Sequence, residues 1–149
     1  MKFTTIDLFC GVGGLTRGFE SANFKTVFAN DFDKEIANSY KANFPDVTFF
    51  EGDISLLNYK NISNNYNIEP GTIDVIIGGP PCQGYSMANR KRIEKDKRNL
   101  LFLEFIRCIR YFKPKCFLIE NVVGMKGENI NHNNENTSVL SAINDYFDN

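Results

Sequence analysis

Strand patterns and helix patterns alternate along this chain of 149 residues, and this alternation limits its possible folds more than any other feature. Apolar runs typical of buried strands lie at 4–9, 25–30, 47–50, 73–77 and 116–119. Amphipathic helix patterns lie between them at 15–22, 34–44 and 100–112. Strands that alternate with helices form a parallel sheet. We therefore predict an α/β fold in which a mostly parallel sheet carries helices on both faces.

Two polar segments interrupt this pattern. The asparagine-rich stretch 58–72 is predicted to be a loop, and 129–136 is predicted to be too polar to pack. A short last helix is expected over 138–147. The chain then ends where a further strand would be expected, so the sheet is predicted to be incomplete on its C-terminal side.

Composition excludes several classes of protein. No apolar run approaches the roughly 20 residues of a membrane span, and the N-terminus enters a strand pattern without a secretion signal. We expect a soluble, cytoplasmic protein with no membrane partner. The single histidine is His132, and no Cys-x-x-Cys pair occurs among Cys10, Cys82, Cys108 and Cys116. Neither a metal site nor a disulfide framework is therefore predicted.

A cysteine follows two prolines directly after the apolar run 73–77. In Gly79-Pro80-Pro81-Cys82 the prolines restrict the backbone, so the turn is suited to presenting the thiol. Only about 3% of a free thiol is ionised at neutral pH unless positive charge lies nearby. Six basic residues against two acidic ones occupy 90–98. A lone cysteine is more often buried and inert, and a charged run is more often a solvated surface, but their combination favours a nucleophile near phosphates.

Three segments are expected at one edge of the sheet, because ligands bind beyond the carboxyl ends of parallel strands. They are the glycine turn 11–14, the loop with Cys82, and Glu120 at the end of the last strand. Glu120 alone would more often be a solvated carboxylate, whereas a carboxylate beside a thiol predicts catalysis. A dinucleotide-dependent dehydrogenase is disfavoured, since Thr16 replaces the third glycine of its fingerprint.

These segments resemble the cytosine-C5 DNA methyltransferase family. Asp7-Leu8-Phe9-Cys10-Gly11-Val12-Gly13-Gly14-Leu15 is similar to its first S-adenosylmethionine motif, Gly79-Pro80-Pro81-Cys82-Gln83-Gly84-Tyr85-Ser86 to its nucleophile motif, and Glu120-Asn121-Val122 to its glutamate motif. The motifs occur in the family's order. The resemblance implies a Rossmann-like, S-adenosylmethionine-dependent methyltransferase fold, with residues 1–149 as the N-terminal portion of the catalytic domain.

The resemblance also implies a cofactor site for S-adenosylmethionine. Asp31 would accept hydrogen bonds from the ribose, Phe32 would lie against the adenine, and Asp53 with Ile54 would contact the adenine edge. The complete implied set is Phe9, Gly11, Gly13, Gly14, Leu15, Asp31, Phe32, Asp53, Ile54, Pro80 and Leu100.

In the reaction that the resemblance implies, Cys82 adds to C6 of a flipped-out cytosine in double-stranded DNA. Protonated Glu120 hydrogen-bonds N3, and Asn121 orients the backbone or the base. The methyl group of S-adenosylmethionine is taken up at C5, and loss of the C5 proton then releases Cys82. A glutamate that holds a proton near neutral pH is expected to be buried. The implied DNA contacts are Gln83, Ser86, Arg90, Arg92 and Arg98.

The chain departs from the family after the glutamate motif. Family members continue with a Gln-x-Arg-x-Arg segment, a target-recognition region and a returning helix, whereas Gln83 is the only glutamine here. We therefore expect either a second polypeptide that supplies these parts or a longer parent protein, in a restriction-modification setting in the cytoplasm or nucleoid. Two alternatives stay open: an RNA cytosine-C5 methyltransferase, and a remnant that binds cofactor or DNA without turnover.

Overall fold

The computed structural model describes residues 2–81, 101–120, 129–132, 135–138 and 141. The elements are, in chain order, β1 (Phe3–Leu8), α1 (Gly14–Ser21), β2 (Phe24–Asp31), α2 (Lys34–Asn43), β3 (Thr48–Glu51), the 3₁₀ turn η1 (Ile54–Leu56), α3 (Tyr59–Tyr66), β4 (Val75–Gly78), α4 (Leu101–Phe112), β5 (Cys116–Ile119), β6 (Asn129–His132) and β7 (Glu135–Ser138). Every strand and helix of the predicted α/β alternation is present, with ends shifted by no more than two residues.

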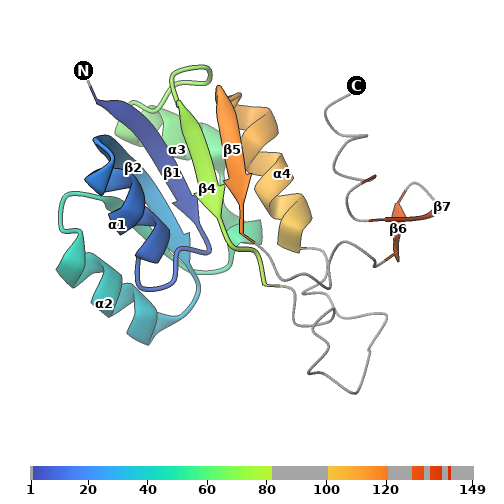
Figure 1. Ribbon diagram of the computed structural model, residues 1–149, viewed down its shortest axis with the longest axis horizontal. Helices are drawn as coiled ribbons and strands as arrows, with labels where there is room; N and C mark the ends of the chain where they lie inside the picture. The colour runs from blue at the N-terminus through green and yellow to red at the C-terminus, as the bar shows by residue number, and fades with distance from the viewer. Residues whose placement is uncertain (1, 82–100, 121–128, 133–134, 139–140, 142–149) are drawn as a thin grey trace.

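The first five strands form one parallel sheet in the order β3-β2-β1-β4-β5 (Figure 1). Their carboxyl ends therefore lie along one edge of the sheet. The direction in which strands are added reverses between β1 and β4, which is where ligands bind in sheets of this kind. Within the described residues β5 is an edge strand, and its Phe117 and Leu118 are exposed, as expected for a sheet without a further strand there.

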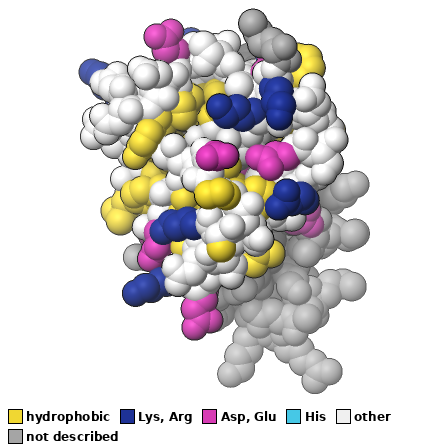
Figure 2. All heavy atoms as spheres, turned by 90° about the vertical axis from the view of Figure 1, so that its left-hand side faces the viewer, with side chains coloured by type: hydrophobic (Ala, Val, Ile, Leu, Met, Phe, Trp, Pro, Cys, Tyr) yellow, Lys and Arg dark blue, Asp and Glu magenta, His cyan; other side chains and the backbone are white. Residues whose placement is uncertain are grey.

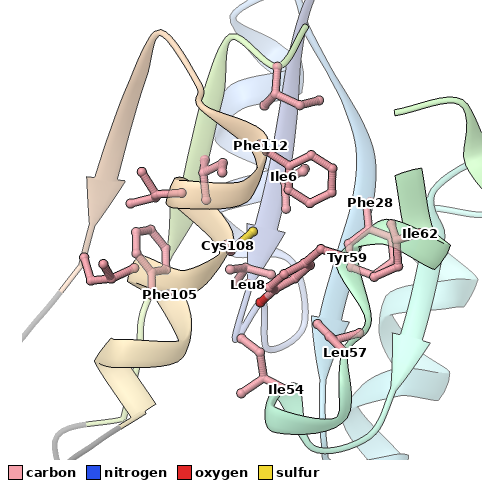
Figure 3. Close-up of a cluster of buried hydrophobic side chains, with 14 of the residues drawn as sticks. Ile6, Leu8, Phe28, Ile54, Leu57, Tyr59, Ile62, Phe105, Cys108 and Phe112 are labelled. Atoms are coloured by element: carbon pink, nitrogen blue, oxygen red, sulfur yellow. The ribbon is translucent and has the colours of Figure 1, made fainter. Parts of the chain in front are cut away.

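Helices α3 and α4 cover one face of the sheet and enclose its larger apolar cluster. Figure 3 shows Ile6 and Leu8 of β1 on the side of Phe105 and Phe112 of α4, and Phe28 of β2 beside Ile62 of α3. Ile6, Leu8, Phe28, Phe105 and Phe112 are each at most 2% exposed. Burying one such side chain contributes about 1.5–3 kcal/mol. This cluster anchors β1 and β4, whose ends carry the candidate site.

Helices α1 and α2 lie on the opposite face, so the prediction of helices on both faces is confirmed (Figure 1). The apolar cluster there is smaller and includes Cys10, Ala29, Tyr40 and Phe44. Figure 2 views the molecule from the side of α1 and α2 and shows acidic and basic side chains interspersed. This side therefore does not present the single-sign charged surface that would attract nucleic acid.

The prediction of a loop over 58–72 is wrong for its first half, which forms α3. Asn58 caps this helix, because its side chain accepts a hydrogen bond from the Asn61 N–H. Tyr59 and Ile62 are buried at helical spacing, and Asn67 ends the helix in the left-handed conformation. Packing of two apolar side chains therefore outweighs the low helix propensity of asparagine.

The polar segment near the C-terminus also contains structure that was not predicted. Strands β6 and β7 pair as an antiparallel hairpin, with Asn129 opposite Ser138. Ser138 therefore belongs to a strand and does not start the expected helix. Beyond it only Ser141 is described, and its backbone is helical. None of the helices in the described ranges is long and apolar enough to cross a membrane.

Candidate functional site

A tight turn follows β1 and leads into α1. Phe9, Gly11 and Gly13 all have positive φ, at 55°, 54° and 91°. The Gly13 N–H donates to the Cys10 carbonyl at 2.9 Å, and Gly13 caps α1 without a side-chain bond. A Cβ at Gly13 would overlap the ring of Phe44, so both the backbone angle and the space require glycine. The first N–H groups of α1 thus open onto the carboxyl edge of the sheet.

Asp31 at the end of β2 holds this turn in place. Its Oδ2 accepts from the Gly11 N–H at 2.9 Å, and its Oδ1 accepts from the Asp33 N–H at 3.1 Å. The next residue, Phe32, is 73% exposed. A carboxylate and an open aromatic ring therefore lie beside the glycine turn, an arrangement that suits a ribose and an adenine ring.

The loop after β3 lies next along the same edge. The Gly52 N–H donates to the Asp31 carbonyl at 2.9 Å, and Asn30 Nδ2 donates to the Gly52 carbonyl at 2.9 Å. Asp53 is exposed and caps η1, because its Oδ1 accepts a hydrogen bond from the Ser55 N–H. This hydrogen bond holds the pKa of the Asp53 carboxyl below its usual value. Ile54 is 3% exposed and belongs to the apolar cluster, so only its backbone can reach a ligand.

A polar chain is buried beneath the glycine turn. Thr16 Oγ1 donates to Asp7 Oδ2 at 2.6 Å, and Tyr40 Oη lies 2.7 Å from Thr16 Oγ1. Because the Thr16 hydrogen points to Asp7, the tyrosine hydroxyl is the donor in the second bond. All three residues are fully buried. One sequence signal pointed to this row of hydrogen-bonded side chains: Thr16 occupies the position at which the dinucleotide-binding fingerprint has its third glycine.

The buried aspartate has an altered acidity. Burial, with a smaller contribution from the nearby Asp31 carboxylate, raises the pKa of Asp7 to about 7. Within the described part of the chain, Asp7 Oδ1 has no hydrogen-bond partner. Burial also raises the pKa of the Cys10 thiol, with the carboxylates of Asp7 and Asp31 adding to the effect. Cys10 is therefore protonated at neutral pH and unsuited to act as a nucleophile.

The ends of β4 and β5 meet on the other side of the switch point. The Glu120 N–H donates to the Gly78 carbonyl at 2.9 Å. A Cβ at Gly78 would overlap the Leu8 carbonyl oxygen of β1. At Gly79 an added Cβ would lie 3.0 Å from Glu120 Oε2, so the glutamate side chain lies directly against this glycine. The side chain of Glu120 is exposed, whereas we expected from the sequence that it would be buried, because a catalytic glutamate must hold a proton near neutral pH.

The predicted site residues divide into two groups and a remainder. Along β1, β2 and β3 the structure brings together Phe9, Gly11, Gly13, Gly14, Leu15, Asp31, Phe32, Asp53 and the backbone of Ile54. At the ends of β4 and β5 it brings together Pro80, which is buried, and Glu120. Eight predicted residues lie outside the described ranges: Cys82, Gln83, Ser86, Arg90, Arg92, Arg98, Leu100 and Asn121. Among the described residues, no three metal-ligating side chains come together.

Comparison with known proteins identifies relatives along nearly the whole chain. A family model described as C-5 cytosine-specific DNA methylase matches residues 3–148. Type II methyltransferase M.AgeI of Thalassovita gelatinovora is 44% identical over 121 residues, which are 81% of this chain and 28% of that protein. Type II methyltransferase M.AquIA of Picosynechococcus is 42% identical over 125 residues, which are 84% of this chain and 50% of that protein. The chain thus spans half or less of the length of these relatives.

Solved structures agree with the fold. A DNA modification methyltransferase encoded within an Escherichia coli prophage superposes with a TM-score of 0.76 at 36% identity, covering 99% of this chain and 37% of that one. DNMT2 of Spodoptera frugiperda superposes with a TM-score of 0.67 over 99% of this chain and 41% of that one. At 22% identity the second likeness concerns the fold alone.

Proposed function

This chain belongs to the C-5 cytosine-specific DNA methylase family, and we propose that it forms the cofactor-binding and nucleophile-bearing part of a DNA (cytosine-5-)-methyltransferase. The observation that carries the proposal is the contact between the Glu120 side chain and Gly79. Cys82 follows Gly79 by three residues. A carboxyl group that lies against the residue three positions before the thiol can act on the same cytosine as the thiol.

The edge formed by β1, β2 and β3 has the groups that S-adenosylmethionine needs. Asp31 offers a carboxylate for the ribose, Phe32 an exposed ring for the adenine, and Asp53 an ionised carboxylate for the adenine amino group. The N–H groups at the start of α1 suit the carboxylate of the methionine part. When bound, the cofactor supplies a methyl group on a positively charged sulfur.

The residues after β4 and β5 would prepare the base. The Cys82 thiolate forms a bond to C6 of the cytosine, and Glu120 donates a hydrogen bond to N3, so that negative charge develops at C5. After methylation the C5 proton leaves, and the electron pair of that bond expels Cys82. Asn121 would orient the base or the adjoining backbone. A stacked base exposes neither face, so the cytosine must leave the helix.

We propose double-stranded DNA as the substrate, with Gln83, Ser86, Arg90, Arg92 and Arg98 as contacts, in the restriction-modification setting of the Type II relatives. Because the matched residues make up only 28% and 50% of those relatives, we propose that activity requires further residues, from a longer parent chain or a second polypeptide. Among the described residues β5 pairs only with β4, and its other edge could accept a further strand, which supports this requirement. A cytoplasmic or nucleoid location belongs to the same proposal.

The test is transfer of labelled methyl from S-adenosylmethionine to unmethylated DNA and to RNA, followed by nucleoside analysis. The chain is assayed alone and together with the C-terminal portion of a Type II relative. Matched variants are Cys82→Ser, Glu120→Gln and, as a control cysteine away from the site, Cys116→Ser, which is exposed on β5. A covalent complex with DNA containing 5-fluorocytosine reports the Cys82 bond directly.

Label in 5-methylcytosine of DNA that is lost in Cys82→Ser and kept in Cys116→Ser would support the proposal. Label in RNA alone would replace it with an RNA cytosine-C5 methyltransferase. Cofactor binding without label or covalent complex under either condition would indicate a remnant that binds but does not turn over.

A further inference from the structure

Arg107 of α4 reaches across to the loop that carries Asp53. Its Nη2 donates to the Ile54 carbonyl and its Nη1 donates to the Leu57 carbonyl, both at 2.9 Å. These carbonyls lie at the two ends of η1, 53 and 50 residues before Arg107 in the chain. One guanidinium therefore spans the whole 3₁₀ turn.

The guanidinium is itself held from two directions. Glu104 Oε2 accepts from Arg107 Nε and lies 2.7 Å from both Nε and Nη2. The guanidinium carbon lies 4.5 Å from the centroid of the Tyr59 ring, and Tyr59 Oη donates to the Glu104 carbonyl at 3.4 Å. A planar fork that is fixed by a carboxylate and stacked on a ring loses little entropy when it binds two carbonyls.

The Asp53 loop is thus held on both sides. Before Asp53, buried Asn30 donates to the carbonyls of Phe50 and Gly52, at 3.0 and 2.9 Å. After Asp53, Arg107 holds η1, and within η1 the Ser55 N–H donates to the Asp53 carboxylate and orients it. The Asn30 bonds come from the sheet, whereas the Arg107 bonds come from a helix on one face of it.

We propose that Arg107 is a positioning residue for cofactor selectivity: by holding η1, it sets the Asp53 carboxylate where it can accept from the amino group of an adenine ring. The inference rests on the proposed function, because it takes the edge at Asp53 to be the adenine site. Arg107 does not touch the ligand. Lysine cannot replace it, since an ammonium cannot donate to two carbonyls and one carboxylate in a plane.

The experiment compares binding of S-adenosylhomocysteine with binding of S-inosylhomocysteine, in which a carbonyl oxygen replaces the adenine amino group. Isothermal titration is performed on the full chain as wild type, Arg107→Lys and Arg107→Met. Lys115→Met is the matched control, because it removes an ion pair of 2.6 Å with Asp74 far from η1. Hydrogen exchange of the Leu56 and Leu57 amides, measured without ligand, reports the turn itself.

Wild type and Lys115→Met are expected to prefer S-adenosylhomocysteine by about tenfold to a hundredfold, the value of one hydrogen bond to a charged group. Both Arg107 variants should lose most of this preference and exchange the two amides faster. If Arg107→Met does not fold, the ligand preference and the amide exchange of Arg107→Lys are compared with those of the wild type.

Preserved preference in Arg107→Lys with unchanged exchange would overturn the inference alone. Failure of the wild type to bind either compound would overturn the proposed cofactor site, and this inference with it. Loss of affinity for both compounds by the same factor would mean that Arg107 serves stability only, which also overturns the inference.

Discussion

The two faces of the sheet are stabilised by different chemistry. Under α3 and α4 lies a large apolar cluster that includes Phe105, Phe112 and Ile76, each at most 1% exposed. Under α1 and α2 lies Asp7, a buried residue of β1. Its carboxylate accepts a hydrogen bond from Thr16, and Thr16 is in turn hydrogen-bonded to Tyr40. On the first face burial raises the pKa values of the titratable groups Cys108 and Tyr59, so both stay neutral at neutral pH, whereas the other face has a carboxyl group with a pKa of about 7.

The difference shows how the contribution of one face of a sheet to stability can be independent of pH while that of the other face depends on it. Apolar packing is insensitive to pH, so the packing of α3 and α4 against β1 and β4 should not change with pH. The carboxyl group under the glycine turn costs free energy when it ionises, because burial disfavours the charged form. Three substitutions test this contrast.

Phe105→Ala is expected to have the largest effect. The ring is fully buried and packs edge-on against Phe117, so its loss leaves a cavity in the apolar face. We expect the free energy of unfolding to fall by about 3–5 kcal/mol, with little dependence on pH. Denaturant titration measures it. Phe117→Ala, at a ring that is 38% exposed, is the control and should cost clearly less; equal costs would mean that the apolar face does not dominate stability.

Asp7→Asn should change how stability depends on pH. The unfolded carboxyl titrates near 3.8 and the folded one at about 7, so between these values the folded chain holds a proton that the unfolded chain has lost. The free energy of unfolding of the wild type therefore falls by up to about 1.4 kcal/mol per pH unit in this window, and not further above it. Asparagine keeps an acceptor for Thr16 and cannot ionise.

The variant should match the wild type near pH 4 and exceed its stability at pH 7, by up to about 4 kcal/mol. Denaturant midpoints measured at half-unit steps of pH give the comparison. Asp46→Asn, at an exposed aspartate on the same side of the sheet, is the control. If the free energies of unfolding of wild type and Asp7→Asn change with pH in the same way, the Asp7 carboxyl does not titrate as described.

Tyr40→Phe should have the smallest effect of the three. It keeps the ring, which packs against Phe44 and Phe49, and removes only the hydrogen bond to Thr16. We expect a loss of about 1 kcal/mol. Tyr66→Phe, at a ring that is 50% exposed, should be neutral in the same thermal or denaturant assay. A loss as large as that of Phe105→Ala would mean that the polar chain, not the apolar cluster, holds the sheet together.

Much of the fold was predictable because its signals are local. The apolar run 116–119 coincides with β5, and the amphipathic pattern 100–112 differs from α4 by one residue. Helix α3 was missed because its asparagines favour a loop, and only contacts of Tyr59 and Ile62 with the core make it a helix. Tertiary packing of this kind has no local signature.

The candidate site was predictable to a similar degree. Parallel strands bring their ends to one edge, so the nearness of Asp31 to the glycine turn and of Glu120 to Gly79 followed from strand order. The bonds of Arg107 to η1 and of Thr16 to Asp7 could not be predicted, since each depends on how a helix sits on the sheet. The exposure of Glu120 likewise depends on three-dimensional packing.

Gly78 and Gly79 are adjacent, yet evolution should restrict them for separate reasons. A methyl group at position 78 would meet the carbonyl of Leu8, a backbone atom that cannot turn aside, so any side chain there would force β1 and β4 apart. At position 79 it would meet the end of the Glu120 side chain, which can rotate away. Selection for a folded chain alone should therefore preserve Gly78, whereas selection for the placement of Glu120 should preserve Gly79.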